Sequence, residues 1–343
     1  GTLSYPAEGT ITSTLSVGAE GHHSELRHLR IRGMGLPSSD ISGLDFAESI
    51  TSGPFAPLEQ YSAIATVGFF VQEQVGVWDR LYLTGGLRAD GSSAFGDDFG
   101  VQVYPKISAS YVIETTEWWS GKLRAAWGQS GKLPTAFAKV QTYSLARGTY
   151  YDRPIISLDD YGNPDLKPEV GTEIEFGLEN YFLGNLASIE VNYWKQTTED
   201  ALLRGAIPLI EGFNAPLMNV AALKSSGVEL IGQVTPLNTE DLSLTVGATL
   251  THLIDNGVIT DLGGDSTASR VGNLYLGMEV GESINAITYT SQIDNRRVFY
   301  GSREPTTYGG AHANFRYGRI RLSTNLSFGA GGVGLDHIQA QED

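Results

Sequence analysis

An alternation of apolar and polar side chains is the feature of this sequence that most restricts its fold. From Leu242 to His252, apolar side chains fill every second position, and mostly serine, threonine or glycine stands between them. The pattern recurs in residues 81–88 and 319–328. Successive side chains of a β-strand point to opposite faces, so this pattern predicts strands with one apolar and one polar face. We expect the apolar face to carry Leu244, Val246, Leu322 and Leu326, and the polar face to carry Thr245, Ser323 and Asn325.

The spacing of the predicted strands separates two architectures. A soluble β-sandwich would turn its apolar faces to a core, whereas a membrane barrel would turn them to lipid. We expect strands near residues 10–18, 23–32, 62–75, 80–90, 101–113, 122–130, 172–182, 186–196, 227–234, 242–252, 307–317 and 319–328. Short links then alternate with long ones, at 33–61, 91–100, 131–171, 197–226 and 253–306. Tight turns on one side and long loops on the other are typical of outer-membrane barrels. The predicted fold is therefore all-β, an antiparallel transmembrane β-barrel with about twelve strands in this chain.

Two further observations favour a membrane barrel. No segment approaches the roughly 18 consecutive apolar residues of a membrane helix, and a bilayer protein without helices must be a closed barrel. Aromatic residues also gather near the predicted short turns, as expected for a belt at the membrane interface. These residues are Trp78, Trp118, Trp119, Tyr181 and Phe182.

Charge and composition exclude several classes of function. The net charge of −16, from 39 acidic and 23 basic residues, argues against a nucleic-acid partner, because phosphate binding needs a basic surface. The absence of cysteine excludes disulfides and thiolate-bound metals. None of the six histidines has a recognisable metal-ligand spacing, and the adjacent His22 and His23 should face opposite sides of a strand.

No catalytic motif is present either. The segment Gly128-Gln129-Ser130-Gly131 lacks the glycine two residues before the serine that a nucleophile elbow needs. The carboxylate pairs 97–98 and 159–160 could act as acid and base or bind calcium in principle, but no further oxygen ligands are spaced around them, so solvated pairs are favoured. We expect no cofactor and no enzymatic activity.

The predicted loop 131–171 is the best candidate for ligand binding. Aromatic rings beside amide and carboxylate groups suit a sugar or peptide surface, although a loop that packs only on itself would look the same. The candidate ligand-binding residues are Tyr150, Tyr151, Asp159, Asp160, Tyr161 and Asn163. After this loop, Glu173, Glu175 and Glu179 share one strand face and should form an acidic stripe inside the barrel.

Several motifs resemble those of SusC/RagA-type TonB-linked outer-membrane transporters. The resemblance covers about residues 60–328, and the motifs follow in the same order as in that family. They are QEQ at 72–74, WDR at 78–80, LTGGLRADGSSAFG at 83–96, YPKISAS at 104–110, LRAAWGQSG at 123–131, GNPDLKPE at 162–169 and KSSGVEL at 224–230.

This resemblance implies a barrel of about 22 strands around a plug, in the outer membrane of a Gram-negative bacterium. It implies import of oligosaccharides or peptides, energised by the TonB complex, with a SusD-like lipoprotein as partner and outer-membrane lipid around the wall. Residues 1–330 are then expected to be a partial barrel with long extracellular loops, and residues 331–343 a polar tail or the start of a further loop. The plug, earlier strands and closing strands are expected outside this chain. Two alternatives remain open, a self-contained small pore and a structural or adhesive barrel protein.

Overall fold

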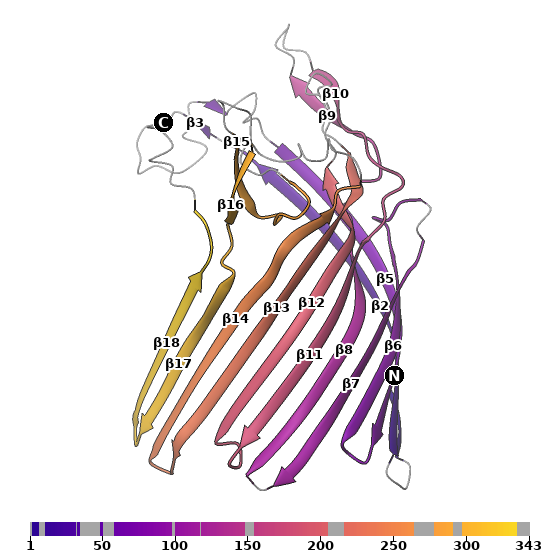
Figure 1. Cartoon of the computed structure of the whole chain (residues 1–343). Helices are drawn as coiled ribbons and strands as arrows, with labels where there is room; N and C mark the ends of the chain where they lie inside the picture. Colours follow the sequence, from indigo (N-terminus) through magenta and orange to yellow (C-terminus); the bar gives the residue numbers. More distant parts are fainter. Residues whose placement is uncertain are drawn as a thin grey trace.

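The computed structural model consists of β-strands joined by turns and loops (Figure 1). It describes residues 2–6, 11–31, 33–34, 49–50, 58–97, 100–116, 118–147, 154–204, 216–263, 278–290 and 297–334. In this part of the chain, no helix is long and apolar enough to cross a membrane.

Twelve strands form one antiparallel sheet in the order β1-β2-β5-β6-β7-β8-β11-β12-β13-β14-β17-β18. Their bounds are β1 Thr2–Pro6, β2 Ile11–Arg30, β5 Leu58–Val77, β6 Leu81–Ser92, β7 Gln102–Thr116, β8 Trp119–Lys132, β11 Glu169–Phe182, β12 Ala187–Arg204, β13 Leu217–Asn238, β14 Leu242–Asp261, β17 Thr307–Tyr317 and β18 Ile320–Ala330. Each of these strands pairs with the next strand of the same sheet along the chain, so the sheet is a continuous meander. The sheet curves, with the short turns along one end and the long connections at the other (Figure 1).

Three short hairpins lie within the long connections. They are β3 (Gly33–Met34) with β4 (Ser49–Ile50), β9 (Thr142–Arg147) with β10 (Pro154–Asp160), and β15 (Ala286–Thr290) with β16 (Arg297–Ser302). The predicted loops 131–171 and 253–306 therefore contain secondary structure of their own.

The predicted break between strands 10–18 and 23–32 was wrong. Gly21 lies inside β2, which pairs with β5 from Ile11 opposite Val77 to Arg30 opposite Leu58. A glycine can occupy a strand without turning it, and here its pairing with Val67 continues the ladder. The first hairpin is instead made by β1 and β2, so the number of strands stays at twelve. His22 and His23 occupy consecutive rungs and so face opposite sides, as predicted.

Several strands extend further toward the long connections than the sequence indicated. β12 continues to Arg204, β13 begins at Leu217, and β14 continues to Asp261. Backbone pairing does not require an amphipathic side-chain pattern, so a strand can continue where the apolar alternation has ended. The alternation reveals only the part of each strand that has one apolar face.

One face of the sheet is apolar and the other is more polar. This difference is clear along a rung, by which we mean the row of paired residues that crosses neighbouring strands. One rung joins Leu83, Ala109, Ala125, Phe176, Tyr193 and Val228 across six strands. The next rung joins Thr84, Ser108, Ala126, Glu175, Trp194 and Gly227 on the opposite face. We call the first the outer face and the second the inner face.

The predicted facing of individual residues is confirmed. Val246 and Leu244 pair with Ala313 and Phe315 on the outer face, while Thr245 lies between them on the inner face. Leu322 and Leu326 are 62% and 67% exposed, because none of the described residues packs on the outer face there. An apolar face that the described residues leave open is suited to contact with lipid.

The aromatic residues predicted near the short turns lie there, but one of them faces inward rather than toward lipid. Trp78 and Trp118 lie in turns and are 65% and 57% exposed, and Trp119 begins β8. Tyr181 instead lies on the inner face, where its hydroxyl donates a hydrogen bond to Glu179 Oε2 at 3.1 Å. The aromatic belt at the membrane interface therefore has one residue fewer than the sequence indicated.

Candidate functional site

The inner face carries an ionic network centred on Arg124 of β8. Arg124 Nη2 lies 2.6 Å from Glu190 Oε1 and donates to Asn192 Oδ1 at 2.8 Å. Arg124 Nε lies 3.0 Å from Glu179 Oε1, and Lys122 Nζ lies 3.4 Å from the same oxygen. Two cations and two carboxylates from β8, β11 and β12 therefore compensate one another.

Gly177 provides the space for this network. A Cβ atom at Gly177 would lie 2.9 Å from Arg124 Nε and 2.7 Å from Asn192 Oδ1, distances that real Cβ atoms essentially never show. The guanidinium therefore crosses β11 where that strand has no side chain. A larger residue here would displace Arg124 from Glu190.

A polar groove lies next to this network on the inner face. Its volume is about 410 Å³, and its lining includes Gln72, Thr84, Lys106, Ser108, Glu173 and Glu175. A smaller adjoining hollow of about 220 Å³ shares Thr84, Ser108 and Glu175 and extends to Arg124. Ser108 and the short Ala126 and Gly128 of β8 keep the floor low between the longer side chains.

The groove has a positive and a negative side. Lys106 of β7 lies on one side of β8, and Glu173 and Glu175 of β11 lie on the other. Two strand spacings separate them, which is about 10 Å. Within the part of the chain that the structure describes, these three charges make no ion pair, unlike those of the Arg124 network. They are therefore available to a bound molecule.

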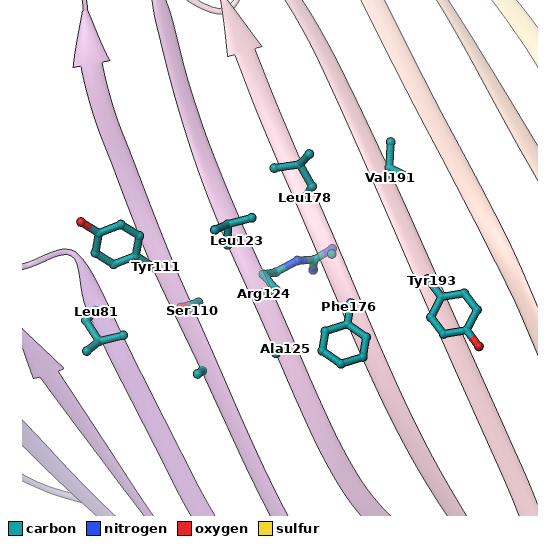
Figure 2. Close-up of a pocket in the computed structure, with 12 residues that line it drawn as sticks. Leu81, Ser110, Tyr111, Leu123, Arg124, Ala125, Phe176, Leu178, Val191 and Tyr193 are labelled. Atoms are coloured by element: carbon teal, nitrogen blue, oxygen red, sulfur yellow. The ribbon is translucent and has the colours of Figure 1, made fainter.

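An apolar hollow lies on the outer face. This shallow depression has a volume of about 540 Å³, and its lining includes Leu81, Tyr111, Leu123, Phe176 and Val191, which Figure 2 labels. Because this face is the one predicted to meet lipid, the hollow is suited to acyl chains rather than to a polar ligand.

The motif segments DGSSAFG and GNPDLKPE come together at the long-loop end. Gly96 N donates to Leu166 O at 2.8 Å and Asp97 N donates to Pro164 O at 3.0 Å. Phe95 and Leu166 are 1% and 0% exposed, so the two segments share a small core. These two motifs therefore build a packed base for the loops.

Asn219 of β13 connects this base to the wall. Its Oδ1 accepts from Lys167 N at 2.9 Å, and its Nδ2 donates to Lys167 O at 3.0 Å and to Asp200 O at 2.8 Å. Asn219 was not predicted as a functional residue, because nothing in the sequence around it indicates contact with a segment 52 positions earlier.

The predicted ligand-binding residues divide into three groups. Tyr150 and Tyr151 lie outside the described residues. Asp160 and Asn163 support the loop itself, since Asp160 Oδ1 accepts from Gly162 N at 3.0 Å and Asn163 Nδ2 donates to Leu217 O at 3.0 Å.

Asp159 and Tyr161 form the third group. Both are exposed, and Tyr161 keeps 53% of its surface open at the base of the β9–β10 hairpin. These two residues remain accessible to a ligand or partner, so the site prediction itself remains a prediction.

The acidic stripe is found on the inner face, as the alternation indicated. Glu179 is held by Arg124, Lys122 and Tyr181, whereas Glu173 and Glu175 line the groove. Lys106 was not predicted as part of the site: its alternation with Tyr104 and Ser108 places it on the inner face, but not opposite the glutamates. Among the described residues, no cluster of histidine and carboxylate side chains could hold a metal ion.

Comparisons with known proteins agree with this architecture. The family model described as TonB dependent receptor-like, beta-barrel matches residues 5–335. TonB-dependent receptor P26 of Formosa agariphila is 28% identical over 285 residues, which are 77% of this chain and 29% of that protein. TonB-dependent receptor SusC of Bacteroides thetaiotaomicron is 27% identical over 244 residues, 64% of this chain and 24% of that protein. The chain therefore spans less than a third of the length of these curated relatives.

Solved structures show the same fold. The structure of the RagAB peptide transporter aligns with a TM-score of 0.77 at 20% identity, covering 96% of this chain and 40% of that chain. The siderophore receptor PirA from Acinetobacter baumannii aligns with a TM-score of 0.54 at 13% identity, covering 96% of this chain and 43% of that one. The matched proteins are receptors and transporters rather than enzymes. Because the family model covers nearly the whole chain, this protein belongs to the TonB-dependent receptor-like β-barrel family, and the predicted resemblance to its SusC/RagA members is confirmed.

Proposed function

We propose that the protein forms part of the wall of an outer-membrane importer that takes up a polar nutrient with energy from the TonB complex. The observation that carries this proposal is the inner-face groove with its uncompensated Lys106, Glu173 and Glu175. A polar molecule in the groove could satisfy these charges with its own hydroxyl, amide or charged groups.

The names of the relatives support two cargo classes. SusC is a homologue over most of this chain, and the RagAB structure is that of a peptide transporter. Hydroxyl, amide and charged groups of the groove could hydrogen-bond either an oligosaccharide or a peptide. By the same likeness, we propose a SusD-like lipoprotein as the partner above the loops and a Gram-negative outer membrane as the location.

Uptake by the intact protein in its own host tests this function. Labelled oligosaccharides and peptides are offered to cells with and without TonB, and accumulation is expected only where TonB is present. Cargo accumulation that is equal without TonB would rule out energised import and favour a passive pore.

The groove has a matched test. Glu173→Gln with Glu175→Gln should reduce cargo uptake, whereas Glu229→Gln should not, because Glu229 lies on the inner face of β13 outside the groove. Protein levels in the outer membrane serve as the control for folding. Equal uptake by both variants would remove the groove from the path of the cargo.

The loop residues are proposed as contacts for the cargo or the lipoprotein partner. Replacing Tyr150, Tyr151 and Tyr161 together by alanine should weaken binding of the partner and uptake of the cargo. Asp159, Asp160 and Asn163 are proposed to assist them through hydrogen bonds. Wild-type binding and uptake in a folded triple variant would exclude these rings from the site.

A further inference from the structure

Basic side chains on the outer face are few and concentrated. Among the side chains that the structure describes in the twelve-stranded sheet, the outer face carries only Arg27, Lys195 and Lys224 as cations. Arg27 is already engaged, since it lies 3.6 Å from Glu25 and 5.4 Å from the centroid of the Tyr61 ring. Lys195 and Lys224 remain, and they lie on the adjacent strands β12 and β13.

These two lysines belong to one polar cluster. Lys195 pairs with Ser226, and Ser226 pairs with Asp255, so one rung crosses β12, β13 and β14. Asp255 accepts a hydrogen bond from Ser226 Oγ at 2.9 Å and lies 3.0 Å from Lys224 Nζ. Asp255 is thus compensated by Lys224. Lys195 is exposed and makes no ion pair within the described part of the chain, which leaves the cluster with an excess positive charge.

The cluster lies directly beyond the apolar part of the outer face. Tyr193 and Val228 occupy the preceding outer positions on β12 and β13, and Val191 and Leu230 precede them. Lys195 follows Tyr193 by one outer position, about 7 Å along the strand. A tyrosine followed by a lysine on the same face is the order expected where hydrocarbon gives way to headgroups.

An apolar hollow adjoins the cluster. Phe176, Leu178, Val191 and Tyr193 line the depression of about 540 Å³ on the outer face (Figure 2). A molecule held at Lys195 by an anionic group could therefore lay an apolar tail beside Tyr193. A free anion would use only the charge, whereas a lipid would use both features.

We propose that Lys195 and Lys224 form a binding site for the phosphate of a lipid headgroup, with the acyl chains in the adjacent hollow. The proposal rests on the fold in a membrane and does not depend on what the protein imports. The excess charge attracts the phosphate, and the three ammonium hydrogens of Lys195 can donate to its oxygens.

Native mass spectrometry of the purified intact protein, titrated with diphosphorylated lipid A, tests the site. Lys195→Gln should weaken binding about fivefold, because one cation near a lipid surface raises the affinity by about that factor. Lys224→Gln should weaken it at least as much, because it also leaves Asp255 uncompensated. Asp255→Asn should strengthen binding, since it removes a negative charge. Lys132→Gln is the matched control, because Lys132 lies on the inner face and pairs with Glu169.

The sign of the Asp255→Asn effect separates a binding role from a structural one. Loss of an ion pair that only supported the sheet would not increase lipid affinity. Weaker binding by Asp255→Asn, or unchanged binding by Lys195→Gln, would overturn the proposal. So would equal binding of a dephosphorylated lipid, or displacement of the lipid by inorganic phosphate at equal concentration, which would identify a site for the free anion.

Discussion

Neighbouring residues of one strand meet different surroundings, and β14 offers the sharpest pair. Val246 faces outward and is 39% exposed, while Thr245 faces inward and its hydroxyl lies 3.2 Å from that of Thr235. An arginine on a lipid-facing side near mid-membrane costs about 2–4 kcal/mol. Val246→Arg should therefore lower the free energy of unfolding in bilayers by about that amount, and Thr245→Arg by much less. Equal losses in denaturant titrations would contradict the membrane assignment.

Removal of Arg124 should cost more than removal of a peripheral lysine. Arg124→Met leaves Glu190 without its cation and Glu179 with Lys122 alone, so we expect a loss of about 1–3 kcal/mol. Lys132→Met removes a single pair whose lysine side chain is 77% exposed, and should cost less than about 1 kcal/mol. Denaturant unfolding of both variants gives the comparison. A smaller loss for Arg124→Met would show that the network does not stabilise the wall.

At the scale of elements, the alternation located most strands but not their ends. Ten of the predicted strands overlap β5 to β18 of the sheet, because one apolar face is a strong periodic signal. The signal failed at Gly21, since a glycine between two polar stretches reads as a turn in sequence while the ladder to Val67 continues. It failed again at the upper ends of β12, β13 and β14, where register shifts interrupt the alternation although Ala201, Ala221 and Ile259 form a buried apolar cluster there.

The side-chain amide of Asn219 joins the loop base to the wall through three hydrogen bonds, which gives a prediction for this element. Asn219→Ala removes three hydrogen bonds to the backbone of Lys167 and Asp200, each of which contributes about 0.5–1.5 kcal/mol. The segment 162–169 should therefore exchange its amide hydrogens faster in hydrogen–deuterium exchange mass spectrometry. Asn238→Ala, at the short-turn end of the same strand, is the control. Unchanged exchange in 162–169 would show that the segment is held by its buried residues alone.

At the scale of the whole molecule, the groove shows what a sequence pattern cannot supply. The acidic side was predictable because Glu173 and Glu175 share one strand. Lys106 comes from a strand that pairs with β8 on its other side, so its position opposite the glutamates depends on two registers. The alternation shows which face of the sheet a residue lies on, but not which residues of the neighbouring strands lie beside it. The loop site was predicted from composition alone, which explains why Asp160 and Asn163 proved to support the loop backbone.

The two margins of the curved sheet give the last prediction. β1 pairs with β2 only from Thr12 to Ser16, and no strand of the described sheet pairs with the second edge of β18. β1 and β18 lie at opposite margins (Figure 1). Unpaired backbone groups are not tolerated in lipid, so we propose that strands outside this sheet pair with these edges.

Cysteine cross-linking tests this closure, because within this chain only the introduced cysteines can form a disulfide with each other. Val246→Cys with Ala313→Cys should form a disulfide in the intact protein, since the two residues are rung partners and cross-strand Cβ atoms lie about 5 Å apart. Leu3→Cys with Thr324→Cys should not, while the amides of β18 should nevertheless be protected from exchange by their external partner. A disulfide between positions 3 and 324 would instead mean that the twelve strands close on themselves, and would favour the self-contained pore over the larger importer.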